Sequence, residues 1–321
     1  MALTRELLRE LKAAGVAGFT FHIDSKQGRP KWKQRNEIEL NELRLSFAEM
    51  LAEVGGLSCA FNSTVYADTL RLVPDLVDWA AKHIDIVHAM VFIAFRQAVP
   101  EMPVDFYAGG QKIDMDTLVY ASTEPQHADL LSTDIVRAIR ERFADFAPCA
   151  YLNGTKKPDA FKWLLSVRVG TKHRIHGYLG AKFIELVQTQ YHFWKGTYLA
   201  YSSPSVLRFG KSVMLLSPFD RGARHAAASY MGSLWRNPLR LFHKMYFQSV
   251  MIIQPVDMLE DGGLNMCDGC PDVTTWNGKL VWSCRLEELK QFGCFVRAVP
   301  TRIDGACHRR DRSVHEESGD A

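Results

Sequence analysis

The sequence predicts an α/β fold for residues 1–98, followed by a mixed α+β middle region at 99–250 and a small cysteine-rich, metal-binding domain at 251–300. Three observations lead to this prediction. Segments with strand periodicity alternate with amphipathic helical segments in the first region. The middle region is rich in aromatic residues and arginines and shows mixed periodicity. The last region contains a cluster of cysteines.

The chain begins with a helical pattern and a strand pattern. Leucines at helical spacing, followed by Gly15, predict a helix over residues 4–14. Residues 18–24 alternate between apolar and polar side chains, which is typical of a half-buried strand. A loop is expected at 27–30, where a glycine and a proline lie close together.

Two further helix–strand units follow. An amphipathic pattern over 37–54 ends at two glycines, and residues 57–65 form the next expected strand. A proline fits the first turn of a helix over 74–83. Residues 84–95 are nearly all apolar, which predicts a strand buried on both faces. Strands separated by helices in this way are expected to run parallel, with right-handed crossovers.

The rest of the chain is less regular. Prolines and glycines interrupt residues 96–126, which we expect to be a linker, and a helix is expected over 130–146. Residues 149–250 match no architecture that periodicity alone identifies. The charged segment at 301–321 is poor in apolar groups and is expected to be a disordered tail.

The composition excludes some classes of function. The chain has 321 residues, 47% of them hydrophobic, and a net charge of +3 from scattered basic residues, so it is not expected to bind nucleic acid. It contains no run of ~18 apolar residues, and its start lacks the apolar core of a signal peptide. We therefore expect a cytoplasmic protein that is not transmembrane, in which thiols stay reduced.

Four of the seven cysteines lie within 28 positions near the carboxyl end, and they predict a metal site. These four are Cys267, Cys270, Cys284 and Cys294. The first two are separated by Asp268 and Gly269, which favour the tight turn that directs both sulfurs toward one ion. The remaining cysteines are isolated and are expected to act as small hydrophobic residues: Cys59, Cys149 and Cys307.

The spacing of these ligands favours an iron–sulfur cluster over zinc. A zinc ribbon usually ends in a second close pair of cysteines. Here thirteen residues separate Cys270 from Cys284, and nine separate Cys284 from Cys294. A [4Fe-4S] cluster accepts irregular spacing because each iron takes one thiolate, and the Cys–Pro pair at 270–271 is similar to ferredoxin motifs. Zinc stays open as the alternative metal.

Three segments resemble a known family. Residues 17–25 (AGFTFHIDS), 57–64 (LSCAFNST) and 88–96 (HAMVFIAFR) look like the fourth, fifth and sixth strands of a radical SAM barrel. The cysteine-rich segment is similar to the auxiliary-cluster domains that many such enzymes carry. The arrangement looks most like the branch that contains tetraether lipid synthases and related radical methylases, and the resemblance covers residues 3–98 and 251–296.

This resemblance implies an incomplete (β/α) barrel of the TIM barrel type. It also implies an enzyme that functionalises unactivated C–H bonds through a 5′-deoxyadenosyl radical. The family's defining Cys-x-x-x-Cys-x-x-Cys motif is absent from the sequence, and so are the first three strands. We therefore expect a shortened gene product, a fragment, or a subunit whose protein partner supplies the missing half, inactive alone. The alternative is a non-catalytic, metal-binding subunit or interaction protein.

The resemblance also implies where S-adenosylmethionine binds, because barrels place their sites at the carboxyl ends of the strands. Those positions hold Asp24, Ser25, Asn62, Ser63 and Arg96. The Asp, Ser and Asn side chains would hydrogen-bond the ribose or amino group of the cofactor, and the arginine would pair with its carboxylate. The alternative for each is a strand-end residue that hydrogen-bonds loop backbone.

Two histidines and one group of aromatic residues carry further predictions. His22 and His88 are expected to be barrel-interior residues, although His22 shares a strand face with Asp24. The aromatic residues of 191–194 and 235–247 are expected to pack in the core. Otherwise they wall an apolar pocket for a small-molecule or lipid-like substrate.

Overall fold

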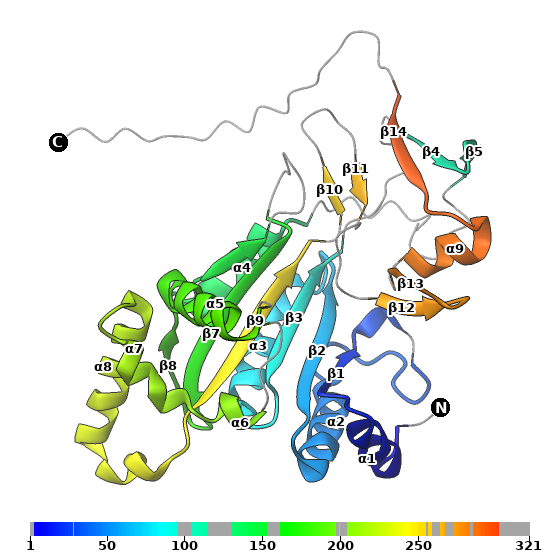
Figure 1. Cartoon of the computed structure of the whole chain (residues 1–321). Coiled ribbons are helices and arrows are strands. Elements are labelled where there is room, and N and C mark those ends of the chain that lie inside the picture. The colour runs from blue at the N-terminus through cyan, green and yellow to red at the C-terminus, as the bar shows by residue number, and fades with distance from the viewer. Residues whose placement is uncertain are drawn as a thin grey trace, which may run out of the picture.

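A seven-stranded mixed sheet with helices on both faces forms the centre of the computed structural model (Figure 1), which confirms the α/β class. The structure describes residues 3–27, 29–95, 104–114, 130–152, 161–196, 199, 204–254, 256–258, 264–266, 273–282 and 285–301. No helix in these ranges is long and apolar enough to cross a membrane. The expected disordered tail lies outside them from residue 302 onward.

Four parallel strands form one half of the sheet, in the order β1, β2, β3, β9. They are β1 (Gly18–His22), β2 (Ser58–Val65), β3 (Ala89–Ala94) and β9 (Tyr246–Ile253). The helices of this half are α1 (Arg5–Ala13), α2 (Asn41–Val54) and α3 (Val73–Lys82). The alternation of helices and parallel strands predicted from the sequence is confirmed as far as β3.

The other half of the sheet is antiparallel. β7 (Trp163–Thr171) lies beside β9, and it also pairs with β6 (Ala150–Leu152) and β8 (Arg174–Tyr178). β9 therefore lies between β3 and β7, and it crosses the boundary expected at residue 250. The described strands make an open sheet with β1 at one edge, and they do not close into a barrel.

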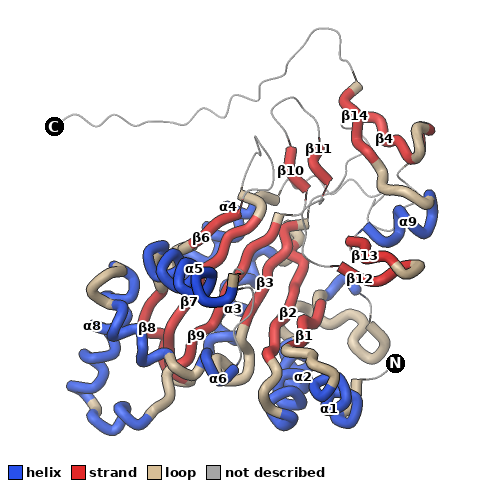
Figure 2. Tube along the Cα trace, viewed as in Figure 1, coloured by secondary structure: helices blue, strands red, loops and turns tan. Residues whose placement is uncertain are grey.

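Apolar side chains pack on the two faces of the sheet in separate clusters. The first joins one face to α1, α2, α3 and α4 (Ser132–Arg142). The second covers the opposite face at β7, β8 and the start of β9, under α5 (Ala181–Lys195), α7 (Val213–Leu216) and α8 (Arg221–Arg236). Figure 2 shows α5 in front of β7. Short helical segments connect these elements: η1 (Ser25–Gln27), η2 (Leu70–Leu72), α6 (Pro204–Leu207), η4 (Gly210–Ser212) and η5 (Pro238–Phe242).

Short strands and one helix make up the rest of the described chain. β4 (Val104–Ala108) pairs with β5 (Gln111–Ile113) and with β14 (Arg297–Pro300). Two hairpins and a helix precede β14: β10 (Val256–Met258) with β11 (Leu264–Met266), β12 (Val273–Trp276) with β13 (Lys279–Trp282), and α9 (Leu286–Phe292).

Several predictions for individual segments also differ from the structure. The segment expected to be a linker contains β4 and β5, because β4 finds its partner near the other end of the chain. The strand expected from residue 84 begins at Ala89, since Ile84 and Val87 bury their side chains in the turn after α3. The helix expected from residue 37 begins at Asn41, because Asn36 Oδ1 accepts two backbone amides and starts a separate turn.

Candidate functional site

The carboxyl ends of β1 and β2 bring a histidine, a carboxylate and a hydroxyl group together. His22 Nε2 lies 2.9 Å from Asp24 Oδ2 and 2.9 Å from Thr64 Oγ1. The strand register pairs His22 with Asn62, so Thr64 lies two residues farther along β2 on the same face. The imidazole keeps 44% of its side chain exposed, whereas the Asp24 carboxylate is buried.

Hydrogen bonds keep Asp24 ionised in this buried position. Burial alone raises the pKa of the carboxyl group. Hydrogen bonds from His22, Thr64 and the backbone amide of Lys26, together with the charge of His22, outweigh burial and hold the pKa below its ordinary value. The carboxylate thus orients the imidazole through Nε2.

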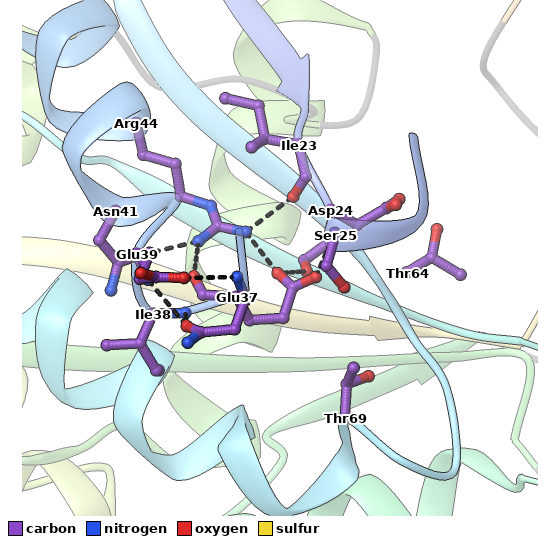
Figure 3. A network of polar contacts seen from close by, with 12 residues as sticks. Ile23, Asp24, Ser25, Glu37, Ile38, Glu39, Asn41, Arg44, Thr64 and Thr69 are labelled. Atoms are coloured by element: carbon purple, nitrogen blue, oxygen red, sulfur yellow. Dashed lines mark hydrogen bonds and ion pairs between the residues drawn. The ribbon is translucent and has the colours of Figure 1, made fainter. Parts of the chain in front are cut away.

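A buried ion pair lies beneath this cluster (Figure 3). Arg44 and Glu37 are almost inaccessible to solvent, and 2.7 Å separates Nη2 of the arginine from Oε2 of the glutamate. Arg44 also donates to the backbone carbonyls of Ile23 and Glu37, at 2.7 Å each. The guanidinium therefore ties α2 to the chain directly before Asp24.

Glu37 in turn holds the two serines that were expected to bind the cofactor. Ser63 Oγ donates to Glu37 Oε2 at 3.1 Å, and the backbone amide of Ser25 donates to Oε1 at 2.5 Å. Ser63 is 1% exposed and lies on the face of β2 opposite to Asn62 and Thr64. Its hydroxyl therefore contacts Glu37 on one face of the sheet, whereas His22 lies on the other face.

Asn62 carries an unsatisfied polar atom. Its Oδ1 is buried and has no hydrogen-bond partner among the described residues. A buried carbonyl oxygen without a donor costs about 1–3 kcal/mol, so such an atom calls for an explanation. Its neighbours in the sheet are His22 on β1 and Val91 on β3. An N–H or O–H group, from a ligand or from a residue outside the described ranges, would satisfy Oδ1.

The sequence-predicted cofactor residues are thus partly brought together. Asp24 follows the carboxyl end of β1 and Asn62 lies on the adjacent β2, whereas Ser25 and Ser63 are held by Glu37. The prediction for Arg96 falls outside the described residues.

Sequence reasoning did not single out Thr64, Glu37 or Arg44. Strand alternation is the signal that could have identified Thr64, because it lies two residues after Asn62 and shares its face. Glu37 and Arg44 are seven residues apart in a segment rich in charges, and no local pattern distinguishes this buried pair from its exposed neighbours. Their role follows only from how α2 packs against the sheet.

The predicted metal ligands are described only in part. Three of them lie outside the described residues: Cys267, Cys270 and Cys284. Cys294 is half-buried and follows Gly293, which ends α9 in the left-handed conformation. In the sequence, β11 ends at Met266, β12 begins at Val273 and β13 ends at Trp282, so the two segments that hold the other three cysteines follow strand ends. Of the four cysteines, only Cys294 belongs to the described residues. Those residues contain no group of three side chains that could hold a metal ion.

The aromatic residues of segments 191–194 and 235–247 do not form the expected core as a group, because Phe247 packs against the second apolar cluster whereas most of the others are exposed. Trp194 is 70% exposed, Trp235 87% and Phe242 80%. A cavity of about 900 Å³ lies elsewhere, where α4 and α5 meet the sheet, with Ile184 among its mainly apolar walls. Cys149 lines this cavity, and burial raises the pKa of its thiol to about 11, so it is a neutral, buried residue as expected.

Comparison with known proteins identifies no family for this chain. No protein-family model matches it, and no curated protein matches it either. Its function is therefore inferred from its own residues.

Proposed function

We propose that the chain is the distal part of a radical SAM iron–sulfur enzyme that functionalises an unactivated C–H bond of a small-molecule or lipid-like substrate. One observation carries the proposal. His22, Asn62 and Thr64 form a polar row at the carboxyl ends of two parallel strands, and Asn62 Oδ1 lacks a partner among the described residues. Open parallel sheets bind ligands at this edge.

The chemistry of this row fits S-adenosylmethionine. Asn62 Oδ1 would accept a hydrogen bond from the amino group or a ribose hydroxyl, and His22, oriented by Asp24, would contact the ribose. Ser25 lies in the turn after β1, and Arg96, which follows β3 in the sequence, would pair with the carboxylate. Beside a [4Fe-4S] cluster, S-adenosylmethionine supplies the radical that abstracts hydrogen.

The four clustered cysteines would hold an auxiliary [4Fe-4S] cluster, because thiolates are the ligands of such clusters. Four reduced thiols are consistent with the cytoplasm. The sequence contains no Cys-x-x-x-Cys-x-x-Cys motif, so the cluster that cleaves S-adenosylmethionine would come from a protein partner or from a part of the same protein that this sequence does not include. β1 pairs only with β2 among the described strands, and its other edge offers a place for that partner to extend the sheet.

Equilibrium binding of S-adenosylmethionine to the purified full chain tests the cofactor site. We expect Asn62→Ala and His22→Ala each to weaken binding roughly 5- to 150-fold, since losing one such hydrogen bond costs about 1–3 kcal/mol. Ser63→Ala is the matched control, because its hydroxyl faces Glu37. Once circular dichroism shows that it folds, this variant should bind as the wild type does. Undetectable binding to the wild type, or an equal loss in the control, would exclude the site.

Anaerobic purification followed by iron and sulfide analysis tests the metal site. We expect about four iron and four sulfide ions for each chain. Replacing Cys267 and Cys284 together by Ser should remove this metal, whereas Cys59→Ser should retain it, because Cys59 is buried within β2. A colourless protein that contains zinc would overturn the assignment to an iron–sulfur cluster.

The missing activating motif favours a second function, a non-catalytic subunit or interaction protein with a structural zinc or cluster site. Such a protein needs the four cysteines but not the polar row at β1 and β2. It would contain metal and would not bind S-adenosylmethionine. The two measurements above therefore distinguish the two functions.

A further inference from the structure

The lobe formed by α7, α8 and η5 exposes many large apolar side chains. Trp235 is 87% exposed, Phe242 80% and Leu215 78%. We define the α7–η5 surface by six exposed residues: Phe209, Leu215, Met231, Trp235, Leu239 and Phe242. Single exposed apolar residues are normal, but a concentration of them in one part of a fold marks an interaction surface.

The geometry of α8 directs part of this surface outward. Arg224, Ala228, Met231 and Trp235 are exposed and recur at helical spacing, on the side opposite to the residues that pack inward. α7 and η5 both pack against α8. Figure 1 shows this lobe at the end of the molecule opposite to α9. The surface is therefore a peripheral one, accessible to a large partner.

The lobe is also strongly basic. Residues 204–245 contain seven lysines and arginines and one acidic residue, Asp220. Asp220 is buried and accepts backbone amides at the start of α8, so it does not offset this charge at the surface. Arg236 directly follows Trp235, and Arg240 lies within η5. Two copies of such a surface would repel each other, whereas an anionic partner is attracted.

A cavity with two arginines lies beside this surface. It has a volume of about 280 Å³ and is enclosed by the turn between β7 and β8, by α8 and by η5. Arg174, Arg240, His173 and His243 line it, and none of the described residues that line it carries a carboxylate. Burial, followed by the charges of Arg174 and Arg240, lowers the pKa of His176 in its wall to about 4. Both guanidinium groups therefore act on the same enclosed space.

We infer that the α7–η5 surface docks on an anionic phospholipid bilayer, with one lipid phosphate in the adjoining cavity. Trp235 and Phe242 enter the boundary between headgroups and acyl chains, where aromatic side chains on a basic helix are favoured. The exposed arginines face the anionic headgroups. Arg174 and Arg240 bind the phosphate, because guanidinium groups match its oxygens and these two form no ion pair with a carboxylate of the described residues. This inference does not depend on the function proposed above.

Co-sedimentation of the full chain with vesicles tests the docking surface. We expect binding to vesicles of phosphatidylcholine mixed with phosphatidylglycerol, little binding to phosphatidylcholine alone, and weaker binding at high salt. The double variant Arg236→Glu/Arg240→Glu should weaken binding at least about 10-fold, because it reverses two charges near the membrane. Trp235→Ser/Phe242→Ser should weaken it by a similar factor.

A double variant on the β12–β13 hairpin is the matched control. Lys279→Glu/Leu280→Ser changes one exposed basic and one exposed apolar residue far from the lobe, and it should bind as the wild type does. Equal binding to both kinds of vesicle, or undiminished binding of the Trp235 and Phe242 variant, would overturn the inference. A dimer that this variant abolishes, without vesicle binding, would assign the surface to a second copy of the chain.

The cavity has a test of its own. Arg174→Ala should weaken binding to the mixed vesicles, and glycerol phosphate should compete better than chloride at equal ionic strength. If inorganic phosphate binds the wild type but Arg174→Ala leaves vesicle binding unchanged, the cavity holds a free anion. That outcome would overturn the assignment of the cavity to a lipid phosphate.

Discussion

Arg44 is completely buried, and burial lowers the pKa of its guanidinium while the carboxylate of Glu37 opposes that change. Arg44→Met would leave Glu37 buried and unpaired. We expect the free energy of unfolding, measured by urea denaturation, to fall by about 3–5 kcal/mol. Arg35→Ala breaks only an exposed ion pair with Glu39 and should cost less than about 1 kcal/mol. Equal losses in the two variants would show that burial of the pair is unimportant.

His88 makes the stability of the parallel half depend on pH. Its Nδ1 accepts the backbone amide of Cys59 at 2.9 Å, and burial, followed by the charge of Arg208, lowers the pKa of the imidazole from 6.5 to about 4. The folded state therefore binds the proton less readily than the unfolded state. The contribution of the neutral ring is complete above pH 6.5 and is lost as the pH falls toward 4.

His88→Gln should consequently flatten the pH dependence of the unfolding free energy between pH 6.5 and 4, measured by urea denaturation at a series of pH values. His225→Gln, on the exposed side of α8, is the control. If the His88 variant keeps the wild-type slope, the titration of this histidine does not govern stability in that range.

At the residue scale, sequence predicted what depends on strand position. Asp24 and Asn62 were singled out because they were expected where strands end; in the structure Asp24 follows β1 by two residues and Asn62 lies within the adjacent β2. Glu37 and Arg44 were not singled out, because burial of a charge pair depends on the part of the fold that covers it. The sequence between these two residues does not show which elements will cover them.

Asp220 connects the starts of two helices. Its carboxylate accepts the backbone amide of Ala223 in α8 at 2.7 Å, and those of Gly180 and Phe183 at the start of α5 at 2.9 and 3.3 Å. Asp220→Ala should lower the unfolding free energy by at least about 2 kcal/mol, because it leaves several amides unsatisfied. Thr4→Ala removes one exposed cap bond from α1 and should cost about 1 kcal/mol. Both variants would be compared by thermal or urea unfolding. If Asp220→Ala loses no more unfolding free energy than Thr4→Ala, Asp220 does not stabilise the starts of both helices.

At the scale of elements, prediction succeeded where one face of an element is apolar and the other is polar. Leucine spacing identified α1, and alternation identified β1, with bounds close to those observed. The strand expected at 84–95 was too long, because Ile84 and Val87 are apolar and buried but belong to a turn. α8 was not identified, since the residues of its inner face are mostly small: Ala223, Ala226, Tyr230 and Ser233.

Gln248 and Arg168 join α3 to both halves of the sheet. Arg168 Nε donates to Gln248 Oε1 at 2.7 Å, and Gln248 Nε2 donates to the carbonyls of Ala80 at 2.8 Å and Val87 at 2.6 Å. Gln248→Leu should cost about 3–5 kcal/mol in urea denaturation, because Arg168 stays buried without this acceptor. Ser249→Ala, on the opposite face of β9, should change stability by less than about 1 kcal/mol. Similar losses in both variants would contradict this role of the pair.

The sequence by itself determined the local units of this protein: the first three helix–strand units, their parallel order, and the clustering of four cysteines near the carboxyl end. Periodicity and spacing are short-range properties, so they can be read along the chain. Only the tertiary structure decided that β9 lies between β3 and β7, that Glu37 and Arg44 support the site, and that the aromatic lobe is exposed. These features depend on contacts between distant segments, such as Gln248 with Val87, for which a single sequence carries no local signal.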